Sequence, residues 1–288
     1  MRRSLLLSAL AAGAATPAFA GTGGAPQWGE WFADPLIELL LTVLVLWYLL
    51  GLERMLSREP QKWPVSRSRV AAFFGAMLVI GVALLSPIDA FADKLFSVHM
   101  LQHLLLMLGA APLLAFSDAH LVLLRALPVA QRRRLGRVVA SIPGVKQAAH
   151  KEVAAWLAAA VFVVTLWFWH IPSAYDWALG NAFVHSCEHL MLLGAATFFW
   201  RVIVTSGNRR LSPGMAVLLV SLVGIQGAFL SALIMFAPQG LYRAYAGNPL
   251  DDQVLAGVLM CIPASFVYLG STVWALSRML GNGRSHAR

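Results

Sequence analysis

The feature that most constrains this chain is a series of seven apolar segments, each close to the length that crosses a bilayer. They cover residues 35–52, 70–86, 97–116, 152–170, 182–204, 213–236 and 254–277. A helix needs about 20 apolar residues to span the hydrocarbon core. Only 12% of the residues are charged, whereas soluble domains average about 25%. We therefore predict an all-α fold, a polytopic transmembrane helix bundle with seven spans after an N-terminal signal peptide.

The first 20 residues have the composition of a secretory signal peptide. Arg2 and Arg3 give a positive start, an apolar stretch follows, and Ala-Phe-Ala at 18–20 is typical of a cleavage site. We expect four regions: a signal peptide at 1–20, an outer N-terminal segment at 21–34, the seven-helix transmembrane domain at 35–280, and a cytoplasmic tail at 281–288.

The basic residues indicate how the spans are oriented. With the mature N-terminus outside, eighteen Lys and Arg fall in the inner loops and tail, and the outer loops carry Lys94 and Arg243 only. Cytoplasmic loops of membrane proteins are enriched in positive charge. We predict a protein of the bacterial cytoplasmic membrane with its C-terminus in the cytoplasm. The net charge of +9 reflects this loop bias, so nucleic acid is not an expected partner.

Histidines gather at the outer ends of three predicted spans. Five of the eight lie there: His99 and His103, His170, and His185 and His189. Both pairs are spaced i, i+4, which places the two imidazoles of each pair on one helix face. The two pairs are also at matching depth below the outer surface. Imidazole binds copper, zinc, iron and nickel, so the spacing predicts a metal site, with His170 as a further ligand.

Other ligand types lie near these histidines in the sequence. Glu188 follows His185 by three residues, as a ligand or as a partner that orients an imidazole. On an α-helix Met107 shares the face of His99 and His103. Cys187 and Cys261 lie at comparable depth on two spans and form a thiolate pair if those helices touch. Met100, Met235 and Met260 complete a set of soft donors, which favour Cu(I).

Three motifs together resemble those of a known family. Residues 97–107 (SVHMLQHLLLM) contain an H-M-x-Q-H signature, residues 169–176 read WHIPSAYD, and residues 185–189 read HSCEH. In this order, at outer helix ends, they resemble the CtaG family of cytochrome c oxidase assembly factors, over about residues 35–277. The resemblance implies an integral membrane protein that helps to form active haem–copper oxidase by supplying copper. It implies His99, His103, His170, His185 and His189 as metal ligands, with Glu188 beside them.

The leading hypothesis is therefore a copper-handling assembly factor and not an enzyme. We expect it to receive Cu(I) from an extracytoplasmic donor, to hold it at the histidine cluster, and to pass it to a haem–copper oxidase subunit within the lipid bilayer.

Three alternatives follow from the same residues. Clustered histidines also occur in membrane-embedded metalloenzymes, such as di-iron enzymes, although these use more carboxylates than the single Glu188. A haem-binding electron carrier would use histidines as axial ligands. A transporter would need charged residues near the bilayer midplane, which the apolar segments lack.

Overall fold

The computed structural model describes residues 35–57, 65–141, 150–205 and 211–285, and within them it is entirely helical. Seven helical spans are long and apolar enough to cross a membrane. Six are single helices: α1 (Pro35–Leu56), α2 (Arg67–Leu84), α9 (Lys151–Trp169), α11 (Ala182–Val204), α12 (Pro213–Met235) and α13 (Leu250–Ser285). The third span, Phe96–Ser117, is composite. The predicted all-α bundle of seven spans is confirmed, and the predicted signal peptide lies outside the described residues.

The third span contains a π-helical turn that the sequence pattern does not predict. It consists of α4 (Phe96–Leu104), the π-helix η1 (Leu105–Ala110) and α5 (Ala111–Ser117). A π-turn changes which backbone groups are paired, and such turns are frequent at functional sites. The indole Nε1 of Trp200 donates to the carbonyl of Met107 at 3.0 Å. The π-turn begins two residues after His103 and changes the direction of the side chains that follow.

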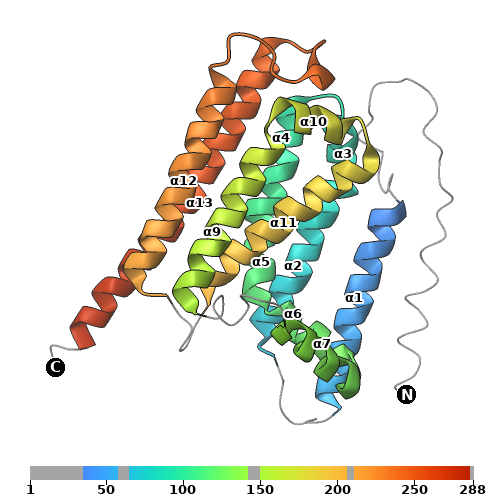
Figure 1. Cartoon of the computed structure of the whole chain (residues 1–288), viewed down its shortest axis with the longest axis vertical. Coiled ribbons are helices and arrows are strands. Elements are labelled where there is room, and N and C mark those ends of the chain that lie inside the picture. The colour runs from blue at the N-terminus through green and yellow to red at the C-terminus, as the bar shows by residue number, and fades with distance from the viewer. Residues whose placement is uncertain (1–34, 58–64, 142–149, 206–210, 286–288) are drawn as a thin grey trace.

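Short helices cover the two ends of the bundle (Figure 1). At one end lie α3 (Pro87–Ala92), α10 (Pro172–Leu179) and the 3-10 turn η3 (Arg243–Tyr245). Proline is favoured in the first helical turn, where no partner is needed for its missing N–H, and both α3 and α10 begin with proline. At the other end α6 (Ala119–Ala126) and α7 (Val129–Ser141) lie across the spans. The two ends of the bundle are therefore covered by different sets of short helices.

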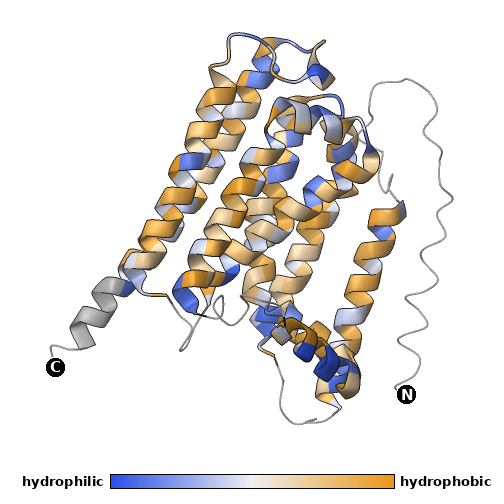
Figure 2. Ribbon diagram, in the orientation of Figure 1, coloured by the Kyte–Doolittle hydropathy of each residue, from blue (hydrophilic) through white to orange (hydrophobic). Residues whose placement is uncertain are grey.

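Two clusters of buried apolar residues hold the spans together. The larger joins the third span with α9, α11, α12 and α13, and the smaller joins α1, α2 and α6 with the opposite side of the third span. The third span is the most buried of the seven and therefore lies at the centre. Large apolar side chains such as Leu78 and Phe266 point outward, as lipid-facing residues do. Figure 2 shows these apolar spans with hydrophilic residues mainly toward the ends.

Close packing at Gly51 joins α1 to α6. A Cβ added at Gly51 would lie 2.1 Å from the carbonyl oxygen of Val122. The indole of Trp47 donates to the Leu123 carbonyl at 3.1 Å, and the Arg54 guanidinium donates to the Ala126 carbonyl. The absence of a side chain at Gly51 therefore permits the backbone approach that these two hydrogen bonds require.

A buried carboxylate fastens three spans at the end that carries α6 and α7. Asp118 adopts a left-handed backbone (φ 52°) between α5 and α6. Its carboxylate forms ion pairs with Arg69 of α2 and Arg201 of α11. Arg201 also donates to the Ala115 carbonyl. This arginine–aspartate clamp fixes the end of the bundle opposite the histidines.

Candidate metal centre

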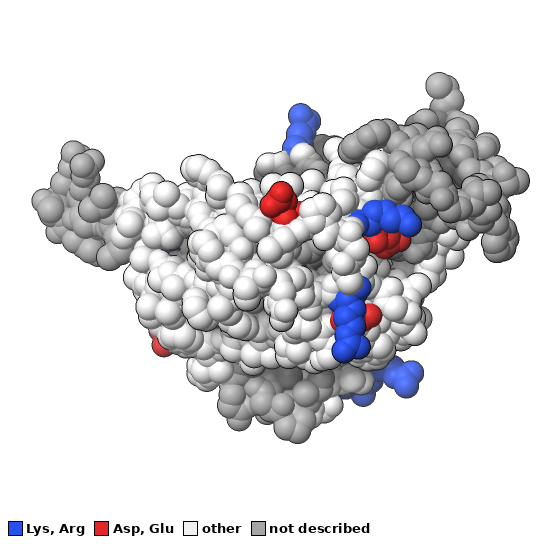
Figure 3. Space-filling view, turned by 90° about the horizontal axis from the view of Figure 1, so that it is seen from above, with Lys and Arg blue, Asp and Glu red and all other residues white. Residues whose placement is uncertain are grey.

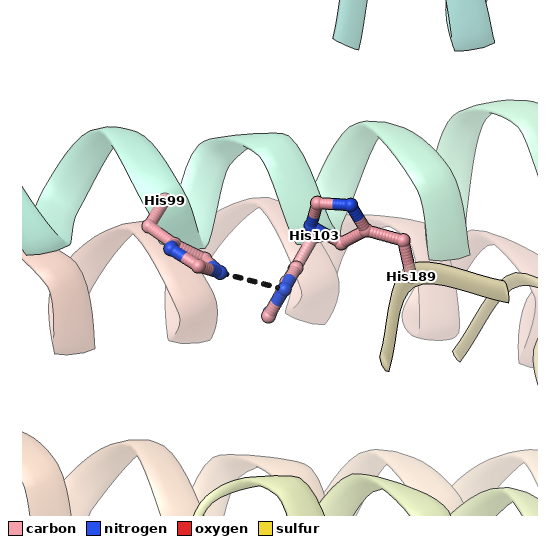
Figure 4. Close-up of side chains that lie close together, drawn as sticks. All are labelled: His99, His103 and His189. Atoms are coloured by element: carbon pink, nitrogen blue, oxygen red, sulfur yellow. Dashed lines mark hydrogen bonds between the residues drawn. The ribbon is translucent and has the colours of Figure 1, made fainter. Parts of the chain in front are cut away.

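The two histidine pairs face each other between α4 and α11. The ring centroids of His99 and His103 are 4.4 Å apart, and those of His185 and His189 are 4.3 Å apart. Across the two helices, His99 is 5.1 Å from His185, and His103 is 5.4 Å from His189. Figure 4 shows His99, His103 and His189 converging. The matched depth and shared face predicted from the spacing are therefore present.

His170, from a third helix, lies beside the four other histidines, but it belongs to neither group whose ligand atoms lie within 4.8 Å of one another. It caps the C-terminus of α9, and its ring lies 6.3 Å from that of His103. Its Nδ1–H donates to the carbonyl of Leu166 at 2.7 Å, so its Nε2 carries the lone pair. Burial lowers the pKa of His170 to about 4, and the imidazole is neutral at physiological pH. The ligand nitrogen is thus free for a metal.

Tyr245 determines which nitrogen of His99 carries the proton. The phenol of Tyr245 donates to the Ala92 carbonyl at 2.6 Å, and burial raises its pKa, so the phenol keeps that proton. The phenol oxygen then accepts from His99 Nδ1 at 3.1 Å. A neutral imidazole has one N–H, so His99 Nε2 carries a lone pair.

His103 fills the position in front of that lone pair. Its Nε2 is 2.9 Å from Nε2 of His99, and because His99 accepts, His103 donates. Two nitrogens that bind one ion at about 2.0–2.1 Å lie about 3 Å apart. A metal ion would take the place between these two imidazoles once the proton of His103 moves from Nε2 to Nδ1, an atom that has no hydrogen-bond partner, because a metal-binding nitrogen must be deprotonated.

Glu188 adds a carboxylate group to the histidine cluster, and this group makes no hydrogen bond. It is fully buried, and neither of its oxygens has a hydrogen-bond partner. Its Oε1 lies 3.7 Å from Nε2 of His103. A buried carboxylate is costly unless it is protonated, paired with a cation or bound to a metal. Its position among imidazoles is suited to a bound cation.

Unpartnered polar atoms concentrate in this cluster. Among the described residues they include Nδ1 of His103, Nε2 of His170, His185 and His189, and both oxygens of Glu188. Buried polar atoms are normally hydrogen-bonded. Two overlapping groups, His99/His103/His189 and His99/His185/Glu188, each have ligand atoms within 4.8 Å of one another. The residues therefore fit a metal ion, and the fit rests on the donor atoms left without partners.

Cys187, Cys261 and Met107, the sulfur ligands proposed from the sequence, lie outside the two groups of candidate metal ligands. Cys187 is a half-buried free thiol outside both groups. Cys261 is also free, and α11 and α13 do not pack extensively against each other in the described residues, so a thiolate pair has no support. Met107 lies in the π-turn and lines, with Cys261, a cavity bordered by none of the five histidines. The expectation for Met107 assumed a continuous α-helix through residue 107.

Several residues that position the cluster were missed by sequence reasoning. Gln102, fully buried, donates to the Ala83 carbonyl at 2.9 Å and to Asp89 at 2.6 Å. Asp252 of α13 accepts from the backbone N–H groups of Phe96 and Ser97 and so caps α4. A glutamine beside His103 in an apolar span was a visible signal. No such signal marks Asp252 or Tyr245, because their partners lie about 150 residues away in the sequence.

Comparison with known proteins identifies the family of this chain. The family model described as cytochrome c oxidase caa3 assembly factor (Caa3_CtaG) matches residues 46–282, which include all five histidines and Glu188. No curated protein and no solved structure matches the chain. The matched region covers most of the sequence and six of the seven spans entirely. This chain therefore belongs to the Caa3_CtaG family of cytochrome c oxidase assembly factors.

Proposed function

We propose that this chain binds copper at the cluster of His99, His103, His170, His185 and His189 and delivers it to the haem–copper oxidase that it helps to assemble. The observation that carries the proposal is the convergence of five imidazoles, four of them nearly excluded from solvent, with several ligand atoms lacking partners. Imidazole suits several metals. The family role in oxidase assembly favours copper among them, because the product contains copper.

The ion is proposed to be Cu(I), carried as cargo. A copper donor outside the membrane would reach His185 first, since it is half-buried while the other four histidines are buried. Asp93, on the exposed surface beside α3, interacts electrostatically with His185 and would attract a cation. Figure 3 shows this end from above, where the described surface is mostly uncharged with a few acidic and basic side chains. Access is therefore proposed to pass by Asp93 and His185.

The proposed orientation places the histidines at the outer face of the bacterial cytoplasmic membrane. The support is charge asymmetry: α6 and α7 carry Arg125, Arg132, Arg133, Arg134 and Arg137 at the end opposite the histidines, and cytoplasmic ends are basic. Reporter fusions test this. A fluorescent protein that needs the cytoplasm to mature should be bright at the C-terminus, and an alkaline phosphatase fusion there should be inactive. The reverse pattern would contradict the orientation.

The delivery function is tested on the oxidase itself. A strain lacking its own copy of this gene is complemented with wild type, with a His99→Leu/His103→Leu variant, or with His120→Ala as a control. His120 lies exposed on α6 at the opposite end. We expect the double variant to yield oxidase depleted of copper and the control to yield normal oxidase. Full copper content with the double variant, at equal expression, would refute delivery through this cluster.

A dinuclear metalloenzyme is the second candidate. The observation that favours it is that two donor groups share His99, an arrangement that can hold two ions. Against it, Glu188 supplies the only carboxylate in those groups, whereas di-iron centres on helix bundles use several. Metal analysis that found two irons per chain, together with turnover, would favour this candidate over copper delivery.

A further inference from the structure

A small cavity lies about one helical turn deeper than the histidines, and three of its lining residues contain sulfur. It has a volume of about 30 Å³ and lies among the third span, α9, α12 and α13. Met107, Met260 and Cys261 line it. Met107 follows His103 by four residues, about 6 Å along a helix axis. The bundle thus has a second place where residue types that can bind metal lie together, separate from the imidazoles.

The cavity wall adjoins the histidine cluster directly. Leu104, which lines the cavity, is the residue after His103. Leu166, also in the wall, holds His170 through the hydrogen bond from Nδ1 to its carbonyl. Leu104 and Leu166 therefore border both the cavity and the histidine cluster. An ion released from the histidines would therefore have a short distance to travel to reach the cavity.

The other lining residues restrict which ion fits. They are mainly apolar or aromatic, together with Gly224, Gly227 and Ser265. About 10–15 Å³ is needed to hold one water, so the space admits an ion with little or no hydration shell. A divalent cation keeps its charge and its waters in such surroundings at high cost. Cu(I) prefers thioether and thiolate ligands, and a single thiolate neutralises its charge.

We propose that Met107, Met260 and Cys261 form a second Cu(I) site beside the histidine cluster. On binding, the Cys261 S–H bond breaks, a sulfur–copper bond forms, and the proton leaves to water. No electron is transferred. Met107 and Met260 are both buried (5% and 6% exposed), and Cys261 is half-buried. This inference rests on the proposed copper function, and the experiment below separates the two.

The test compares three purified full-length proteins loaded with Cu(I) under reducing conditions. One is wild type, one carries Met107→Leu, Met260→Leu and Cys261→Ser, and a matched control carries Met77→Leu and Cys187→Ser. Met77 is a buried methionine of the smaller core cluster, and Cys187 lies outside the cavity. These replacements nearly conserve volume, and such changes are well tolerated. Size-exclusion chromatography and circular dichroism check folding.

The readouts are bound Cu(I) per chain and the sulfur contribution to X-ray absorption at the copper edge. We expect sulfur scattering in the wild type and in the control. The triple variant should lose this scattering and should bind about one Cu(I) fewer per chain. Unchanged copper number and spectrum in the triple variant would overturn the sulfur site while leaving the histidine site standing. If the triple variant does not fold, the same two readouts are measured on a single Cys261→Ser variant.

The His99→Leu/His103→Leu variant separates the two proposals. Loss of the nitrogen-bound ion with sulfur scattering retained supports both sites. Wild-type copper content in this variant, with sulfur scattering retained, would contradict the histidine proposal and support the sulfur site. Wild type that binds no Cu(I) at all would overturn both.

Discussion

Replacing Tyr245 with phenylalanine should weaken Cu(I) binding although Tyr245 is not a proposed ligand. In the wild type its oxygen accepts the Nδ1–H of His99 at 3.1 Å and so keeps a lone pair on Nε2, the nitrogen that faces His103. In Tyr245→Phe this N–H has no acceptor in a fully buried site, which costs about 1–3 kcal/mol. The proton can instead move to Nε2, which faces His103 at 2.9 Å. His99 then has no lone pair on the nitrogen that faces the other imidazole.

Loss of such an outer partner typically lowers metal affinity 10–100-fold, or about 1.4–2.7 kcal/mol. The assay is Cu(I) titration of detergent-purified protein against a chromophoric Cu(I) chelator. Phenylalanine keeps the ring that packs at 5.5 Å from Phe96, so the fold should persist. Tyr48→Phe is the control, since Tyr48 is a buried tyrosine stacked on Phe73 in the other core cluster. Wild-type affinity in a folded Tyr245→Phe protein would refute the tautomer argument.

Three further substitutions probe the site and the bundle. Glu188→Gln removes the buried charge without changing size, and we expect about tenfold weaker Cu(I) binding in the same titration; unchanged affinity would exclude the carboxylate from the site. Gly51→Ala places a methyl against the Val122 carbonyl, and we expect about 1–3 kcal/mol of destabilisation by thermal unfolding, while Gly81→Ala, with open space around its Cβ, should change little. Asp118→Asn keeps the left-handed backbone, which asparagine tolerates, but breaks the arginine–aspartate clamp. It should lower stability by about 1–2 kcal/mol with normal Cu(I) affinity, and a loss of copper binding there would contradict the separation of the two ends.

The sequence predicted the spans and the histidine pairs because both depend on local patterns. Span length follows from bilayer thickness, and the described helices agree with the predicted segments to within a few residues at most ends. The i, i+4 spacing places His99 with His103, and His185 with His189, on single faces. The unequal distribution of basic residues between the loops gave the orientation of each span, and this orientation placed the two histidine pairs at the same depth. These features need no knowledge of which helices touch.

The remaining features of the site arise from packing between distant segments. The π-turn at Leu105–Ala110 has no sequence period of its own, so the direction of Met107 could not be predicted. Tyr245 reaches His99 only because residues 236–249 fold back over the end of the bundle. In the sequence it was one of several aromatic residues near an interface. The sulfur-lined cavity likewise needs the packing of α13 against α4, which brings Cys261 and Met260 beside Met107.

Whether the histidines hold copper is tested by measuring the number of Cu(I) ions that are bound with nitrogen ligands. Purified wild type and the His99→Leu/His103→Leu variant are each loaded with Cu(I), washed and examined by metal analysis and copper-edge X-ray absorption. We expect at least one nitrogen-coordinated Cu(I) per wild-type chain and none in the variant. Equal nitrogen-coordinated copper in both proteins, or none in the wild type, would contradict this expectation.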